Sequence, residues 1–131
     1  YHQAETLRMK DAEERAYQPD YIAVGYDLPA AEMPPAYVKY LYSFGCPVLH
    51  MTWEEAEMTK ICVNMMLAAQ VDATNRFAAA CKKVGAQWAH VAQALAHDKR
   101  IGKEAYLTPG RWQDSKHLLR DAVTLEALST P

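Results

Sequence analysis

The sequence lacks the long apolar run of a membrane helix and the basic runs of a nucleic-acid-binding segment. A membrane span takes about 18 or more consecutive apolar residues, and no run in the 131 residues approaches that length. No five consecutive residues are basic, and the formal net charge is −2, which argues against electrostatic binding of nucleic acid. An apolar N-terminal segment with a basic flank, typical of a secretory signal, is also missing. We therefore expect a soluble, cytoplasmic protein that binds neither nucleic acid nor membrane.

Glycine and cysteine are scarce, with five and three residues. No G-x-G-x-x-G motif occurs, so the sequence shows no dinucleotide-binding turn. The cysteines, Cys46, Cys62 and Cys81, are 16 and 19 residues apart. This spacing matches no zinc or redox motif, and we predict small buried hydrophobic residues. His90 and His97 share a helix face without a third ligand at a suitable spacing, so we predict no metal site.

From Trp53 onward, no proline or glycine occurs until Gly85. Thr52 is a good N-cap, and Glu55 stands three residues later, which makes a capping box. The stretch predicts one helix of about 32 residues, or about 48 Å.

This long helix carries apolar residues on more than one face, so it must be covered on several sides. One small domain does not easily cover it, but a second copy of the chain does. We therefore predict a homodimer through the helix 53–84. If that face is buried between two copies, Ala68→Glu or Ala69→Glu is expected to break the dimer.

Shorter elements flank the long helix, and together they predict a mainly α fold with one or two short strands near the N-terminus. The expected helices cover 3–16, a segment that begins near Pro35 and ends at Gly45, 87–97 and 113–129, and the expected strands cover 21–25 and 47–51.

Three motifs resemble those of a known family. Residues 56–64 read Ala-Glu-Met-Thr-Lys-Ile-Cys-Val-Asn, residues 98–102 read Asp-Lys-Arg-Ile-Gly, and residues 107–110 read Leu-Thr-Pro-Gly. They resemble the start of the central helix, the Asp-x-Arg-Ile-Gly motif and the entry to the glycine-rich catalytic loop of UDP-glucose/GDP-mannose dehydrogenases. The resemblance runs from about residue 2 to residue 128 without a gap.

The resemblance implies a fold similar to the C-terminal domain of 6-phosphogluconate dehydrogenase. It implies that residues 1–51 are a remnant of the end of the cofactor domain and that residues 52–131 are the helical dimerisation domain. In the family, NAD-dependent oxidation converts a UDP- or GDP-sugar alcohol to the uronic acid. The family's Rossmann and nucleotide-sugar domains are absent from this sequence, so we expect no cofactor in this chain.

The resemblance also assigns roles to individual residues. Lys60 and Asn64 would steady a developing oxyanion, and Asp121 would help proton transfer. Glu5 resembles the family's glutamate near the attacking water. Arg100 resembles an arginine that reaches the substrate of the partner subunit. Each of these residues is also compatible with an ordinary structural or surface position.

The expected catalytic loop departs from the family pattern. His117 stands at the position of the nucleophilic cysteine, which would form a thiohemiacetal and then a thioester. Three glycines of the loop are missing, and Trp112 would fill the space that they leave. We therefore predict no oxidation of a sugar alcohol at this site. His117 is either a base beside Asp121 or a plain surface histidine.

Three functions are compatible with these observations. The first is the central dimerisation domain of a nucleotide-sugar 6-dehydrogenase-like protein, inactive as this chain. The second is a stand-alone dimerisation or scaffold module without catalysis. The third is a regulatory protein that binds a sugar nucleotide through Lys60, Asn64 and Arg100. The sequence does not favour one sugar nucleotide over another.

Overall fold

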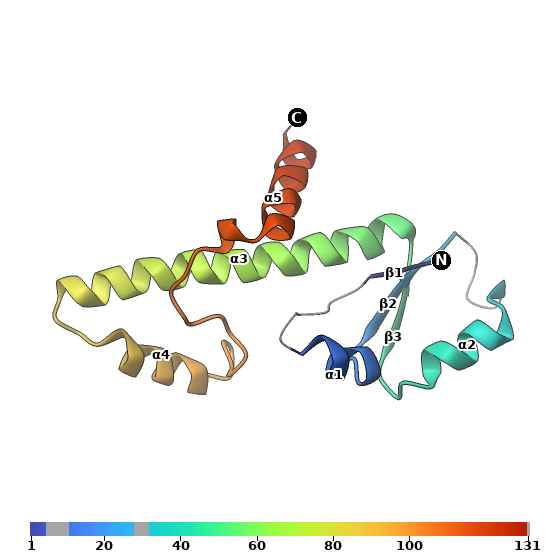
Figure 1. Ribbon diagram of the computed structural model, residues 1–131, viewed down its shortest axis with the longest axis horizontal. Coiled ribbons are helices and arrows are strands. Elements are labelled where there is room, and N and C mark those ends of the chain that lie inside the picture. The colour runs from blue at the N-terminus through green and yellow to red at the C-terminus, as the bar shows by residue number, and fades with distance from the viewer. Residues whose placement is uncertain (5–10, 28–31, 131) are drawn as a thin grey trace. The chain divides into compact units, whose positions relative to one another are not determined.

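The computed structural model describes residues 1–4, 11–27 and 32–130 (Figure 1). The chain forms two compact units, Tyr1–Cys62 and Val63–Pro131. As expected, it is mostly helical, with one long helix, shorter helices beside it and a small N-terminal sheet. Glu5, one of the predicted site residues, lies outside the described residues.

The first unit contains a three-stranded sheet in the order β1-β2-β3. β1 (His2–Ala4) runs antiparallel to β2 (Ile22–Gly25), which runs parallel to β3 (Val48–Met51). The helix α2 (Pro35–Tyr42) connects the two parallel strands, and α1 (Ala12–Tyr17) precedes β2. Parallel neighbours need such a crossover connection, since a hairpin turn cannot link them.

The core of the first unit is apolar. All four residues of β2 are buried, as expected of a central strand that is apolar throughout. Pro35 occupies the first turn of α2, where its missing N–H costs no hydrogen bond. The core cluster consists of Ile22, Val24, Met33 and Leu41.

The expected helix over 3–16 is wrong at its beginning. Gln3 and Ala4 lie in β1, opposite Val24 and Ala23. Residues 12–16 of the predicted helix lie in α1, and residues 5–10 are outside the described residues. Hydrogen bonding to a buried strand outweighs the weak helix propensity of Gln3 and Ala4. The sheet therefore has three strands, whereas one or two were expected from the sequence.

The helix α3 (Trp53–Lys83) confirms the predicted long helix and its capping box. The amide of Thr52 donates to Oε2 of Glu55 at 2.7 Å, and the amide of Glu55 donates to Oγ1 of Thr52 at 3.3 Å. The helix ends at Lys83, two residues before Gly85, whose φ of 74° lies in the left-handed region that glycine adopts without strain.

The second unit contains the rest of α3, then α4 (Trp88–His97), a 3-10 turn η2 (Trp112–Asp114) and α5 (Lys116–Ser129). α4 folds back along the end of α3, where Phe77 and Trp88 lie with ring centroids 6.4 Å apart (Figure 1). α5 begins later than predicted because residues 112–114 form the 3-10 turn. No helix in the described ranges is long and apolar enough to cross a membrane.

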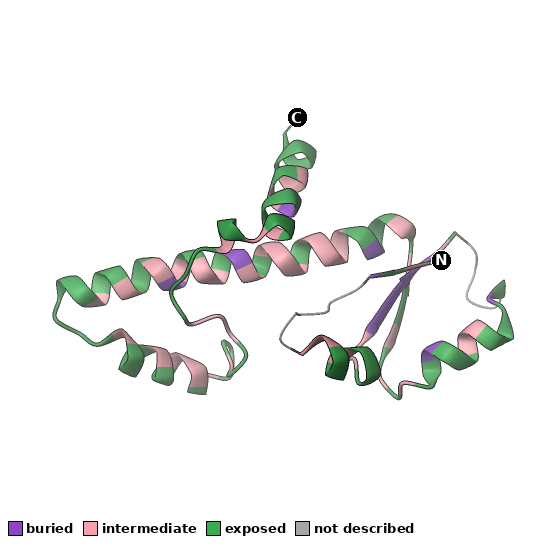
Figure 2. Ribbon diagram, viewed as in Figure 1, coloured by how far each residue is buried: buried purple, intermediate pink, exposed green. Residues whose placement is uncertain are grey.

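α3 is covered unevenly within the second unit (Figure 2). Ala68 is 4% exposed, whereas its neighbour Ala69 is exposed. Ala68→Glu would therefore disturb the fold of the single chain and does not test a dimer. Of the two substitutions, only Ala69→Glu remains a test of the dimer. Cys62 is exposed and the other two cysteines are half-buried, so the prediction of three buried cysteines is wrong.

Candidate functional site

Two of the predicted site residues meet in the second unit. Asn64 of α3 donates from Nδ2 to Oδ2 of Asp121 on α5 at 2.6 Å. Asp121 is only 2% exposed, and a buried carboxylate is stabilised by such donors. The contact joins residues that are 57 positions apart in the chain.

Arg120 completes this contact, although it was not among the predicted site residues. Its Nε lies 2.8 Å from Oδ1 of Asp121, and its Nη2 lies 2.6 Å from the same oxygen. The arginine side chain is 68% exposed, whereas that of Asp121 is 3% exposed. A partly solvated guanidinium thus compensates the buried negative charge. Its position directly before Asp121 in the sequence is the signal that could have indicated this contact.

Lys60 is half-buried and lies one helical turn before Asn64 on α3. A separation of four residues places two side chains on the same face of a helix. The sequence thus predicted the register of these two residues correctly. The oxyanion role that the resemblance gives them stays a prediction.

His117 is exposed in the first turn of α5. In the described part of the chain, no hydrogen bond or ion pair joins it to Asp121, whose carboxylate oxygens accept from Asn64 and Arg120. A base needs a partner that orients its ring. This position favours the surface histidine over the base beside Asp121.

Arg100 lies in the turn after α4, with a side chain that is 89% exposed. Its guanidinium donates to both oxygens of Asp98, at 3.0 and 2.7 Å. These hydrogen bonds hold the pKa of the Asp98 carboxyl below its ordinary value. The exposed guanidinium is accessible to a partner, as the predicted substrate contact requires, but this chain already provides it with a carboxylate.

Trp112 is held in place by a specific contact. Its indole Nε1 donates to Oδ1 of Asp72 on α3 at 2.9 Å. The ring is half-buried. Where the family has a glycine-rich loop, this chain thus carries a bulky side chain tied to the long helix.

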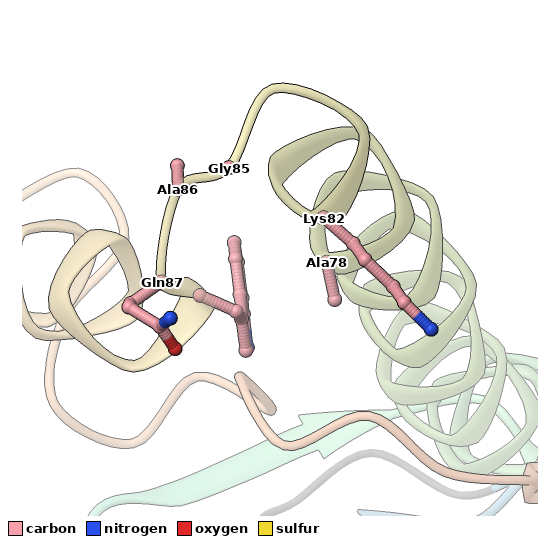
Figure 3. A pocket seen from close by; sticks show the side chains of 6 residues that line it. Ala78, Lys82, Gly85, Ala86 and Gln87 are labelled. Carbon is pink, nitrogen blue, oxygen red and sulfur yellow. The ribbon is translucent and has the colours of Figure 1, made fainter.

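The end of α3 and the start of α4 enclose an open hollow of about 280 Å³ (Figure 3). Its lining comprises Ala78, Lys82, Gly85, Ala86, Gln87 and Trp88. It contains no predicted site residue and no paired acid and base. Elsewhere in the described ranges, no group of three or more His, Cys, Asp or Glu residues could hold a metal ion.

Comparison with known proteins gives the family. The family model described as "UDP-glucose/GDP-mannose dehydrogenase family, central domain" matches residues 54–129. The matched part includes the contact between Asn64 and Asp121. The chain therefore belongs to the UDP-glucose/GDP-mannose dehydrogenase family, and its helical part corresponds to the family's central domain.

Individual relatives agree with this assignment. The chain is 33% identical over 103 residues to the UDP-glucose 6-dehydrogenase of Rhizobium meliloti. The aligned residues make up 76% of this chain and 24% of that protein. It is 38% identical over 61 residues to UDP-glucose 6-dehydrogenase TuaD of Bacillus subtilis, with shares of 47% and 13%. A UDP-glucose dehydrogenase structure from Pyrobaculum islandicum matches with a TM-score of 0.68 and 30% identity over 78% of this chain and 23% of that one. The chain thus spans about a quarter or less of the length of these three proteins.

The family implies NAD, and the described residues do not fit it. The glycine at the end of β2, Gly25, has no open space beside it, because an added Cβ would lie 2.7 Å from the carbonyl oxygen of Thr52 and 2.8 Å from Cβ of Ala56. A pyrophosphate needs a glycine turn that leaves room for the ligand. The start of α3 fills that room here, so Gly25 does not form a site for the pyrophosphate of NAD.

Proposed function

We propose that this chain is the dimerisation domain of a nucleotide-sugar 6-dehydrogenase-like protein and does not itself oxidise a UDP- or GDP-sugar. The exposed apolar face of α3 carries the proposal. It consists of Met66, Ala69, Ala73, Phe77, Ala80 and Val84, and all but the half-buried Ala73 are exposed. Met66, Phe77 and Val84 are 65%, 52% and 80% exposed. Residues at spacings of three and four lie on one side of a helix.

The opposite side of α3 is occupied by the chain itself. Asn64, Ala68 and Asn75 lie on that side, because each residue turns the helix by about 100°. Asn64 contacts α5, Ala68 is buried, and Asn75 contacts Gly110. These contacts leave most of the apolar face exposed, although the ring of Phe77 also lies near that of Trp88 in the same chain.

A second copy of the same helix is the occupant that fits this face. The face combines three alanines with three larger apolar side chains, with the exposed Arg76 at its edge. Such a face can pack against itself about a two-fold axis. From residue 66 to residue 84 it extends for about 27 Å. An apolar patch of that length on a small domain is typical of an interface.

A matched pair of neighbouring alanines tests the dimer. Ala79 and Ala80 are both exposed on α3, but only Ala80 lies on the apolar face. We expect Ala80→Glu to give a monomer at micromolar concentration, since it buries an unpaired carboxylate in the interface. Ala79→Glu should keep the mass of the dimer. Sedimentation equilibrium measures both, and two variants of equal mass, or a monomeric parent chain, would contradict the proposal.

The lack of oxidation is supported by the position of His117. An exposed imidazole in place of the thiolate forms no thiohemiacetal, the adduct that the second oxidation converts to a thioester. We expect no NAD reduction when the chain is mixed with UDP-glucose or GDP-mannose, and the absorbance of NADH at saturating substrate measures it. Turnover by the purified chain would overturn this part of the proposal.

Binding of a nucleotide sugar is tested separately by thermal melting. A ligand that binds only the folded chain raises its melting temperature. A clear rise with millimolar UDP-glucose would favour a sugar-nucleotide binder over a plain dimerisation domain. The cytoplasmic location and the boundary between residues 51 and 52 stay predictions.

A further inference from the structure

The segment 105–112 is the last part of the connection from α4 into η2, and it crosses α3 (Figure 1). Residues 105–111 of this segment belong to no helix or strand. Its first anchor is the backbone of Tyr106. The amide of Tyr106 donates to Oε1 of Gln70 at 2.9 Å, and Oγ1 of Thr74 donates to the carbonyl oxygen of Tyr106 at 2.8 Å. Two side chains one turn apart on α3 thus satisfy both polar groups of one residue, and Thr74 is only 2% exposed.

The second anchor is the backbone of Gly110. Nδ2 of Asn75 donates to its carbonyl oxygen at 2.8 Å, and its amide donates to Oδ1 of Asn75 at 3.0 Å. A side-chain amide that both donates and accepts replaces the pair of bonds that a neighbouring strand would provide. An apolar residue at position 75 could do neither.

Two indole groups add further anchors. Nε1 of Trp112 donates to Asp72, as described above, and Nε1 of Trp88 donates to the carbonyl oxygen of Leu107 at 3.0 Å. The acceptor and donor side chains on α3 lie within residues 70–75, about one and a half turns of the helix. Such a concentration of side-chain to backbone bonds fixes a segment that has no regular structure of its own.

We propose that residues 105–112 are a strap that is seated on α3 in the absence of any ligand, and that Gln70, Asp72, Thr74 and Asn75 hold it there. The strap occupies the part of the chain where the family resemblance predicted the entry to the catalytic loop. It links α4 to α5 structurally and does not depend on a substrate to order it. All of its bonds lie within one chain, so the strap does not depend on the proposed dimer.

Hydrogen exchange of two amides tests the strap. The amides of Tyr106 and Gly110 lie outside helices and strands, and each has a single side-chain acceptor. We expect both to exchange at least tenfold more slowly than unprotected peptides in NMR spectra of the chain alone. Exchange at the unprotected rate in the parent chain would overturn the proposal.

Substitutions of Gln70 and Asn75 test whether these two side chains protect the amides of Tyr106 and Gly110 from exchange. Gln70→Met removes the acceptor of Tyr106 and should release that amide more than the amide of Gly110. Asn75→Leu should do the reverse. Gln93→Met, at an exposed position of α4, is the matched control and should change neither rate. Equal release of both amides by Gln93→Met would contradict the assignment.

Two further measurements keep the outcomes distinct. If Asn75→Leu does not fold, the parent rates and Gln70→Met decide the question. Addition of NAD and UDP-glucose should leave both rates unchanged, and protection that appears only with these ligands would overturn a strap that is seated without them. A failure of the dimer appears in the sedimented mass, whereas a failure of the strap appears in these two amides.

Discussion

The two units of the chain bury different kinds of residue. In the first unit the central cluster is apolar, and Leu41 and Val24 are fully buried. In the second unit, the buried residues in the described ranges are Ala68, Thr74 and Asp121, of which two are polar. Its large apolar side chains are exposed instead, among them Met66, Phe77, Val84, Val123 and Leu128.

The difference shows how each unit is stabilised. Burial of apolar surface is the main favourable term in folding and grows with the area removed from water. A hydrogen bond makes a smaller net contribution but fixes geometry, since a partner left unpaired is costly. The first unit therefore resembles a small closed core. The second is held by hydrogen bonds between polar side chains and leaves large apolar side chains exposed.

The largest effect is expected from a cavity in the first unit. Leu41→Ala removes a side chain that is fully buried beside Ile22 and Val24, and should lower the free energy of unfolding of this unit by about 2–5 kcal/mol. Exchange of the β2 amides in urea measures it. Leu49→Ala in β3, where the leucine is 44% exposed, is the control and should have a much smaller effect. Similar losses in both variants would mean that no closed core exists.

Glycine substitutions compare the packing of the two units. An added Cβ at Gly25 would lie 2.7 Å from backbone oxygen and 2.8 Å from another Cβ, whereas at Gly110 it would meet nothing within 4 Å. Gly25→Ala should therefore destabilise the first unit by about 1–3 kcal/mol through overpacking. Gly110→Ala should leave thermal melting nearly unchanged, because its amide can still donate to Asn75. A larger effect at Gly110 would reverse the comparison.

The hydrogen bond between Asn64 and the buried Asp121 in the second unit is tested by a substitution of Asp121. Asp121→Ala leaves the amide of Asn64 without its buried acceptor and should destabilise the second unit by about 1–3 kcal/mol. Asp114→Ala is the matched control, because its ion pair with Arg111 is long, at 3.6 Å, and both side chains are mostly exposed. Exposed pairs contribute about 1 kcal/mol or less. Chemical unfolding followed by tryptophan fluorescence should give a lower midpoint for Asp121→Ala than for Asp114→Ala. Equal midpoints would show that the hydrogen bond between Asn64 and Asp121 does not stabilise the second unit.

The smallest effect is expected at the exposed pair of Asp98 and Arg100. The pKa of Asp98 is lowered by its hydrogen bonds to Arg100, so Arg100→Gln should raise it toward the ordinary value of an aspartate. Because the lowered pKa belongs to the folded state, the pair stabilises folding above the unfolded pKa and loses this effect as the pH falls through the folded pKa. NMR titration of the Asp98 carboxyl measures the change, which added salt should reduce. A titration identical in both chains would show that the pair does not form in solution.

Most helices could be predicted from the sequence because their signals are local. The capping box at Thr52 and Glu55, the lack of proline up to Gly85 and that glycine itself lie within or next to the helix they delimit. The strand at Gln3 and Ala4 could not be predicted in this way. It forms because these residues pair with β2, some twenty positions later in the chain.

The candidate site was predictable only in part. The family resemblance selected Asn64 and Asp121, and the structure brings them together. It gave no indication of the bond between Asn75 and Gly110 or that between Asp72 and Trp112. Such contacts depend on how a segment without regular structure returns along α3, and no local pattern encodes that path.

By itself, the sequence determined that a long capped helix exists and that the chain resembles the dehydrogenase family. Which sides of that helix are covered was decided only by the tertiary structure. Ala68 and Ala69 are identical in type and adjacent in sequence, yet one is buried and the other exposed. The physical reason is that α3 has apolar residues on several faces, so its amphipathic pattern is too weak to choose a side. The hydrogen bonds from α5 and from the segment 105–112 to α3 determine which side of the helix is covered.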